Sequence, residues 1–256
     1  FMIRPDSANN FMDAIEKSYI VIQNLKKLLK SKKMLTNVGD EGGFAPSINT
    51  NEEALKLIVD SIEKSNLKPG KDIVICLDVA ANELINDKGE YSIQSKSFTS
   101  VDNVINYYKK LTSNYPIKSI EEPFAEEDWN SWKKITNEIG TNVQIVGDDL
   151  FVTNTKRLEK GVKETSANCI LVKPNQIGTL TETLKVISMA KKANLNTIIS
   201  HRSGDTEDTF IADLAVGTKS SQIKTGSLAR SERVSKYNRL LRIEEELGKS
   251  IKMAKV

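Results

Sequence analysis

The chain has 256 residues and a net charge of +3, from 37 Lys and Arg against 34 Asp and Glu. Hydrophobic residues make up 39% and charged residues 28%, an ordinary composition for a globular protein with a sizeable core. This near-balance of charge argues against a nucleic-acid-binding protein, which concentrates basic charge on one face. No apolar run approaches the roughly 18 residues of a membrane span, and no signal peptide is visible, so we expect a cytoplasmic location.

The first quarter of the chain combines one strand with two helices. Residues 1–4 form a short apolar strand pattern, and apolar residues at helical spacing cover about 7–30. A glycine-rich loop follows at 37–44, and a second helix begins near Asn51, with acidic residues in its first turn. Because the chain begins at Phe1 inside a strand pattern, we expect a fragment of a longer protein and an N-terminally incomplete fold.

Short apolar runs and amphipathic segments alternate through the rest of the chain. The runs are 73–77, 117–120, 143–146, 169–172, 197–199 and 222–223. The helical segments are about 101–112, 128–139, 154–164, 178–193, 207–217 and 230–247, and an insertion occupies about 82–99. This alternation predicts parallel strands buried on both faces. It favours an α/β fold with one β/α barrel domain over 1–256, rather than a doubly wound sheet, because no Gly-x-Gly-x-x-Gly loop follows a strand.

The two cysteines, Cys76 and Cys169, lie far apart in sequence and each sits within an apolar run. This placement predicts reduced core residues rather than a disulfide.

A polar residue of catalytic type stands at the end of each of six predicted strands. They are Asp78, Glu121, Asp148, Lys173, His201 and Lys224. Apart from the step that contains the insertion, their spacing matches one strand-helix unit. Barrel active sites are built at the C-terminal ends of the strands, so we expect all six side chains at one mouth.

The chemistry of this set points to a metal and a base. Three carboxylates from neighbouring strands make a hard oxygen site of the kind that suits Mg²⁺. A lysine near other cations loses its proton more readily and can then act as a base. A polarised carboxylate and a lysine that removes the adjacent proton would give an enolate-type intermediate.

A simpler interpretation exists for each residue taken singly. An acidic residue at a strand end is commonly a helix N-cap or a solvated loop residue, an interpretation that suits Glu122, Glu127 and Asp149. A lone histidine such as His201 is commonly structural or surface-exposed. Six polar residues in step with the strand-helix period are much harder to attribute to chance.

Several longer segments are similar to those of the enolase family, and the resemblance covers almost the whole chain. They are 39–46 (GDEGGFAP), 77–83 (LDVAANE), 119–129 (SIEEPFAEEDW), 147–154 (GDDLFVTN), 171–179 (LVKPNQIGT), 200–208 (SHRSGDTED), 222–226 (QIKTG) and 230–248. The resemblance implies the C-terminal enolase-type barrel, which is TIM-barrel-like. A lysine or histidine base with Mg²⁺ is the established pattern of that superfamily.

The resemblance also implies an activity. It is that of a lyase, phosphopyruvate hydratase, which interconverts 2-phosphoglycerate and phosphoenolpyruvate in glycolysis. The implied roles are metal ligands for Asp78, Glu121 and Asp148, the base for Lys173, the general acid for Glu41, and substrate contacts for His201, Arg202, Ser203 and Lys224. Two Mg²⁺ per active site and a homodimer in the parent protein are implied as well.

The departures from the family pattern leave alternatives open. The family has a Gln-Glu pair just before its Phe-Met-Ile, and that Glu partners the general acid. The family also has a capping domain and a first barrel strand. We expect this chain to lack that Glu, the capping domain and the first barrel strand. We therefore expect little activity from the isolated chain. The alternative is a truncated, non-catalytic remnant that acts as a binding or scaffold protein. A third possibility, another lyase or racemase of the superfamily, is disfavoured by the segment 200–204 and by the surroundings of Lys224.

Overall fold

The computed structural model of the protein describes residues 1–94 and 96–256. The strands of its main sheet are hydrogen-bonded in the order β1-β2-β5-β6-β7-β8-β9, and β3 and β4 form a separate antiparallel pair. The bounds are β1 Met2–Arg4, β2 Val74–Asp78, β3 Tyr91–Ile93, β4 Lys96–Phe98, β5 Ile117–Glu121, β6 Gln144–Gly147, β7 Cys169–Val172, β8 Asn196–Ser200 and β9 Gln222–Lys224.

Helices follow most of these strands, as the alternating pattern predicts. Their bounds are α1 Phe11–Ser31, α2 Asn51–Lys64, α3 Val101–Asn114, α4 Trp129–Ile139, α5 Thr155–Glu164, α6 Pro174–Ile177, α7 Leu180–Lys192, α8 Phe210–Gly217 and α9 Ser231–Leu247. Polar side chains cap several helix starts. The side chain of Asn10, for example, accepts a hydrogen bond from the N–H of Asp13, and α1 therefore begins at Phe11 rather than near residue 7.

The chain divides into two compact units, and each is described by itself. Unit 1 comprises residues 1–2 and 75–198, and unit 2 comprises residues 3–74 and 199–256.

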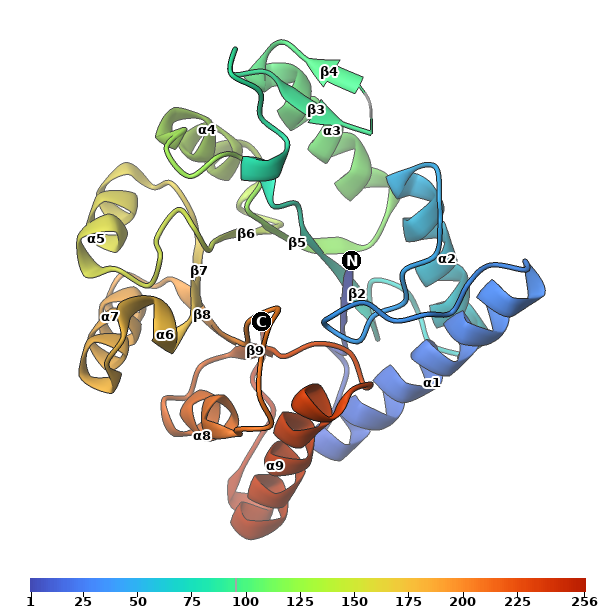
Figure 1. Ribbon diagram of the computed structural model, residues 1–256. Helices are drawn as coiled ribbons and strands as arrows, with labels where there is room; N and C mark the ends of the chain where they lie inside the picture. The colour runs from blue at the N-terminus through green and yellow to red at the C-terminus, as the bar shows by residue number, and fades with distance from the viewer. Residues whose placement is uncertain (95) are drawn as a thin grey trace. The chain divides into compact units, whose positions relative to one another are not determined.

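Unit 1 is built on parallel strands that are buried on both faces. β2 pairs with β5, β5 with β6 and β6 with β7, all in parallel. Val146, Cys169, Leu171 and Ile198 form one core cluster between successive strands. The helices α3, α4, α5 and α7 lie on one side of these strands, in the arrangement of repeated strand-helix units (Figure 1).

Unit 2 is built on helices packed against one another. α1 packs against α2 and α9, and α9 also packs against α8. Leu28 and Leu29 of α1 contact Leu57 of α2 in a buried cluster. The carboxylate of Glu244 on α9 accepts hydrogen bonds from the N–H groups of Phe11 at 2.5 Å and Met12 at 3.0 Å, which ties the start of α1 to α9.

The structure confirms the predicted strands and the major helices to within a few residues. It adds the β3–β4 hairpin, the short η1 helix at Ala81–Glu83 and the short helix α6, none of which the sequence pattern predicts. Cys76 and Cys169 are free and buried, as expected. Within the described part of the chain, no helix has both the length and the apolar character needed to cross a membrane.

Candidate active site

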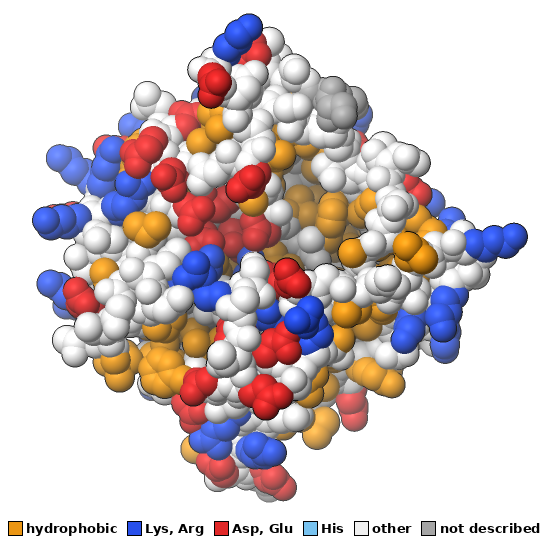
Figure 2. All heavy atoms as spheres, in the orientation of Figure 1, with side chains coloured by type: hydrophobic (Ala, Val, Ile, Leu, Met, Phe, Trp, Pro, Cys, Tyr) orange, Lys and Arg blue, Asp and Glu red, His pale blue; other side chains and the backbone are white. Residues whose placement is uncertain are grey.

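Three of the predicted site residues are carboxylates at the ends of neighbouring strands in unit 1. Asp78 is the last residue of β2 and Glu121 the last residue of β5, and the two are register partners across the parallel pair. Asp148 follows β6 directly. Glu121 and Asp148 are buried, whereas Asp78 is exposed. The three carboxylates therefore stand at the C-terminal ends of β2, β5 and β6, as the sequence pattern predicts. Acidic side chains gather on the face of unit 1 that Figure 2 shows.

Lys173 forms an ion pair with Asp148. Its Nζ lies 2.5 Å from Oδ2 of Asp148, and both side chains are largely shielded, with 15% and 11% exposure. Nε2 of Gln176 donates to the other carboxylate oxygen, Oδ1, at 3.2 Å. Asp148 is therefore held from two directions by groups on the segment after β7.

Thr153 links the two residues that hold Asp148. Its hydroxyl accepts from the backbone N–H of Lys173 at 3.0 Å and donates to Oε1 of Gln176 at 2.8 Å. Thr153 is fully buried and has a φ of +53°, after Val152 at +42°. Two successive β-branched residues in the left-handed region are strained, and such strain is concentrated at functional sites. No pattern in the sequence indicates these roles of Thr153 and Gln176.

Glu122 is not a solvated loop residue, in contrast to its simplest interpretation from sequence. It is 3% exposed, and its Oε1 accepts from the N–H groups of Asp148 at 2.6 Å and Leu150 at 3.3 Å. Its Oε2 is buried without a hydrogen-bond partner among the described residues. Burial raises the pKa of Glu122 to about 9, so this side chain is a neutral acid at pH 7.

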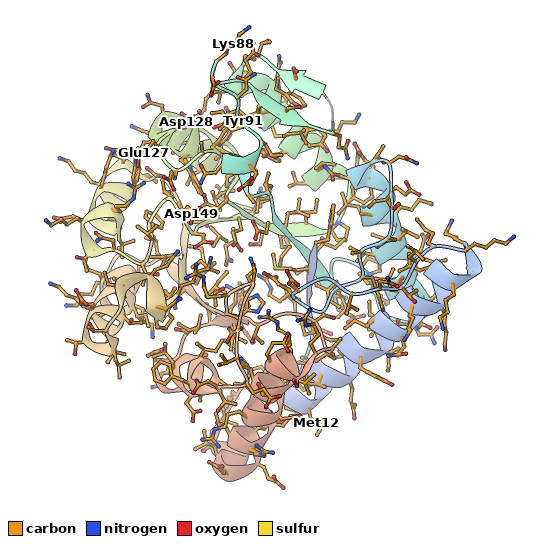
Figure 3. The ribbon with its side chains drawn as sticks, viewed as in Figure 1. Met12, Lys88, Tyr91, Glu127, Asp128 and Asp149 are labelled. Carbon is orange, nitrogen blue, oxygen red and sulfur yellow. The ribbon has the colours of Figure 1, made fainter. Side chains whose placement is uncertain are left out.

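Glu127 and Asp149, the other two acidic residues that could be helix caps or solvated loop residues, lie closer to the surface. Glu127 forms an exposed ion pair with Arg157 at 2.7 Å, as a surface loop residue does. Asp149 accepts from Nδ2 of Asn82 at 3.3 Å and is half-buried. Figure 3 places Glu127, Asp128 and Asp149 along the loops of unit 1 near Tyr91, and only Asp149 is close in sequence to a predicted metal ligand.

Unit 2 brings Glu41, His201 and Ser203 together. Oγ of Ser203 donates to Oε1 of Glu41 at 2.9 Å, and Nε2 of His201 lies 3.4 Å from Oε2. The latter contact is mainly electrostatic, because Nε2 makes no hydrogen bond of good geometry. His201 holds the pKa of Glu41 at about 2, against an ordinary value of 4.5, and Lys224 and Ser203 act in the same direction. Glu41 is therefore a carboxylate at physiological pH.

Arg202 and Lys224 lie beside this group in the same unit. Arg202 is exposed, and its backbone N–H donates to Oδ2 of Asp205 at 3.1 Å. Lys224 ends β9, and its carbonyl accepts from the N–H of His201 at 2.9 Å. The charge of Lys224 contributes to the low pKa of Glu41.

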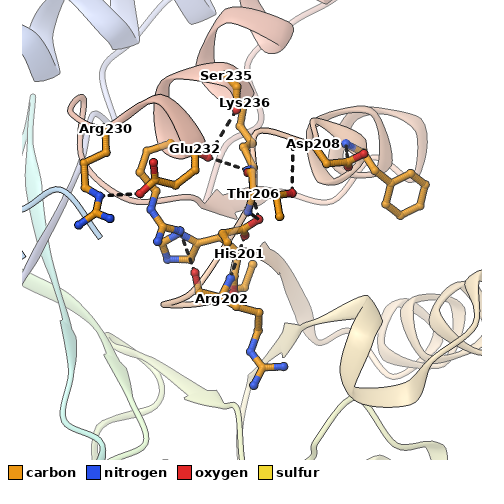
Figure 4. A network of polar contacts seen from close by, with 12 residues as sticks. His201, Arg202, Thr206, Asp208, Arg230, Glu232, Ser235 and Lys236 are labelled. Carbon is orange, nitrogen blue, oxygen red and sulfur yellow. Dashed lines mark hydrogen bonds and ion pairs between the residues drawn. The ribbon is translucent and has the colours of Figure 1, made fainter. Parts of the chain in front are cut away.

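Two buried cations on α9 support the loop that follows β8. Arg233 is 0% and Lys236 1% exposed. Nζ of Lys236 lies 3.3 Å from Oδ1 of Asp205 and also donates to the carbonyls of Thr206 and Glu232 (Figure 4). The sequence pattern predicts this helix over about 230–247 but not the burial of Arg233 and Lys236, since charged residues on a helix ordinarily indicate a solvated face.

The predicted site residues thus fall into two sets, each brought together within its own unit. Asp78, Glu121, Asp148 and Lys173 belong to unit 1, whereas Glu41, His201, Arg202, Ser203 and Lys224 belong to unit 2. In residues 1–94 and 96–256, no group of three or more His, Cys, Asp or Glu side chains has metal-binding geometry. Both oxygens of Asp148 instead accept hydrogen bonds from Lys173 and Gln176.

Comparison with known proteins decides the family. The family model described as "Enolase, C-terminal TIM barrel domain" matches residues 1–255. The chain belongs to this enolase barrel family. The enolase of Pelagibacter ubique (strain HTCC1062) is 63% identical over all 256 residues, and the chain spans 61% of the length of that relative. Membership of the enolase barrel family confirms the predicted resemblance and fold class.

Proposed function

We propose that this chain carries catalytic residues of a phosphopyruvate hydratase, which interconverts 2-phosphoglycerate and phosphoenolpyruvate. The observation that carries the proposal is the pairing of Lys173 with Asp148 beside two further strand-end carboxylates. A proton acceptor next to a hard oxygen site is what removal of a proton adjacent to a carboxylate requires. The enolase relative supports the same reaction. We further propose that the parent protein is a homodimer and acts in cytoplasmic glycolysis.

Mg²⁺ is the proposed cofactor, because the donor set of unit 1 consists of carboxylate oxygens. Asp78, Glu121 and Asp148 would hold the ion, and their hard oxygens are the ligands that Mg²⁺ prefers. When bound, Mg²⁺ would stabilise the negative charge that develops on the substrate carboxylate.

Lys173 is the proposed base at C2 of 2-phosphoglycerate. The ion pair with Asp148 holds its Nζ in a fixed position. A base must be a neutral amine, and a lysine is more readily neutral where other cations offset its anionic partner. Thr153 accepts a hydrogen bond from the backbone N–H of Lys173, and Gln176 donates one to the Asp148 carboxylate, so both groups are fixed in position. Lys224 would contact the substrate carboxylate and stabilise the charge there.

Glu41 is the proposed proton donor to the departing hydroxyl group. With a pKa of about 2 it is ionised, so it can donate only after its surroundings change. The family resemblance gives the general acid another glutamate as its partner, and a second carboxylate placed against Glu41 would raise the pKa of Glu41. The exposed Arg202 and Ser203 would bind the phosphate, for which the planar donor fork of arginine is suited.

A chimera tests the proposal on this chain's own residues. The chain would replace the corresponding 61% of the Pelagibacter ubique enolase. We expect the chimera to form phosphoenolpyruvate and to exchange the C2 proton of 2-phosphoglycerate with D₂O, measured by absorbance and by proton NMR. Lys173→Ala should abolish both activities, by at least about a thousandfold.

Lys185→Ala is the matched control, because Lys185 is an exposed lysine of α7 in the same unit. It should leave both activities unchanged. A folded chimera without proton exchange, or undiminished exchange in Lys173→Ala, would contradict the proposal.

A further inference from the structure

The buried guanidinium of Arg233 contacts the imidazole of His201 and backbone carbonyls of two loops. Nη1 lies 2.6 Å from Nδ1 of His201 and donates to the carbonyl of Arg202 at 2.8 Å. Nη2 donates to the carbonyls of Ser203 at 2.6 Å and Asp40 at 3.1 Å. Arg233 is fully buried, so its side chain has one orientation in which it contacts both the segment of Glu41 and the segment of His201.

The contact with His201 fixes where the imidazole carries its proton. A guanidinium is always protonated and has donors only. At 2.6 Å the Nδ1 of His201 must therefore be the acceptor, with a free lone pair. A neutral imidazole with an acceptor at Nδ1 carries its proton on Nε2. Nε2 is the atom that faces Glu41.

We propose that Arg233 is a positioning residue that holds His201 as the neutral Nε2–H tautomer, so that a neutral N–H donor faces Glu41. Protonation of His201 would place an N–H on Nδ1 opposite the N–H of Arg233. Arg233 therefore opposes protonation of His201. The neighbouring Glu41 carboxylate favours it, since an anion stabilises the imidazolium. Arg233 prevails because it is buried and 2.6 Å from the ring, whereas the Glu41 side chain is 3.4 Å away and 41% exposed.

The other charged groups around His201 do not change this conclusion. Lys224 on β9 is a further cation near Glu41, and it lowers the pKa of that carboxyl. Asp205, on the loop that follows β8, is paired with Lys236 of α9. A neutral Nε2–H has a consequence that rests on the proposed function: it places a polar N–H 3.4 Å from Oε2 of Glu41 without the full positive charge that would oppose protonation of Glu41, and Glu41 must be protonated to act as an acid.

The tautomer can be read directly, because His201 is the single histidine among the 256 residues. The 256-residue chain would be labelled with ¹⁵N-histidine, and the two ring nitrogens observed by long-range ¹H–¹⁵N NMR. We expect one protonated nitrogen, assigned to Nε2, and one unprotonated nitrogen at pH 7. An imidazolium at pH 7, or a proton on Nδ1, overturns the proposal in the unmodified chain.

Two variants separate positioning from a general structural role. Arg233→Lys keeps a cation but loses the fork, and should give a mixture of the two neutral tautomers at pH 7. Lys236→Met removes the other buried cation of α9, which does not bond the ring, and should leave the tautomer unchanged. An unchanged signal in folded Arg233→Lys would overturn the proposal. The NMR signals of His201 do not depend on turnover. The tautomer can therefore be tested even if the chimera proves inactive and the proposed function fails.

Discussion

Nζ of Lys173 lies 2.5 Å from Oδ2 of Asp148, and the amide of Gln176 donates to the second oxygen of the same carboxylate. One carboxylate thus restrains a lysine through one oxygen and is itself oriented through the other. The Thr153 hydroxyl closes the ring by bonding both the Lys173 backbone and Gln176. The predicted base, Lys173, and the predicted metal ligand, Asp148, therefore belong to one hydrogen-bonded network and position each other.

This coupling can be measured with a double-mutant cycle. Asp148→Asn and Lys173→Met should each destabilise the chain, because each leaves its largely buried partner unpaired. The double variant should lose less than the sum, with a coupling free energy of about 1–3 kcal/mol from urea unfolding. Asp148→Asn paired with the exposed Lys185→Met supplies the control, for which additivity is expected. Additivity at Lys173 would show that the pair contributes no stability.

Mg²⁺ should raise the thermal midpoint of the chain. A ligand that binds the folded state alone stabilises it in proportion to the logarithm of its concentration. We expect a rise in midpoint between about 0.1 and 10 mM Mg²⁺, measured by calorimetry, and no rise in Asp78→Asn. Asp87→Asn removes an exposed carboxylate of the loop before β3 and should respond like the unmodified chain. An equal response in Asp78→Asn would place the ion elsewhere.

Glu41 should make the chain lose stability in acid. Its folded-state pKa, about 2, is below the ordinary value of 4.5, so its contribution is present above pH 4.5 and disappears as the pH falls toward 2. Because the side chain is 41% exposed, solvent screening limits the contribution to about 1 kcal/mol. Urea unfolding of Glu41→Gln should show lower stability than the unmodified chain at pH 6, and the difference should shrink below pH 4.5 and be largely lost by pH 2. A difference that stays constant from pH 6 to pH 2 would contradict a pKa of about 2 for Glu41.

Gly226 should not tolerate a side chain. Its φ is +86°, and a Cβ there would lie 2.8 Å from the carbonyl oxygen of Glu41 and 2.7 Å from Cδ of Arg233. Gly226→Ala should therefore reduce the free energy of unfolding by about 2 kcal/mol or more. Gly204→Ala is the matched control: no atom lies within 4 Å of its added Cβ, and we expect a change below about 1 kcal/mol. Similar values for the two variants would mean that the segment of Gly226 relaxes freely.

The sequence predicts this fold well where a pattern reports burial. The run at Cys169–Val172 is the strand β7 to the residue, because a strand covered on both faces must be apolar throughout. The sequence pattern does not predict the strand β3, Tyr91–Ile93, since three residues are too few to show a period. Each catalytic-type residue at a strand end was predicted from its position.

The supporting residues of the site could not be predicted in the same way. Glu122 and Arg233 are charged residue types, which are ordinarily exposed. Their burial depends on segments distant in sequence: Glu122 bonds the N–H of Asp148, and Arg233 bonds the carbonyl of Asp40. Only the assembled backbone shows that these side chains have partners.

The glycine-rich loop 37–44 is locked to two segments more than 180 residues further along the chain. The carbonyl of Glu41 accepts from the N–H of Ser227, and the carbonyl of Asp40 accepts from Arg233. A designer who transplanted this loop into another barrel would move a sequence without its conformation. The loop 37–44, the segment 226–229 and the first turn of α9 should therefore evolve together. A substitution in any one of them is expected to select compensating changes in the other two.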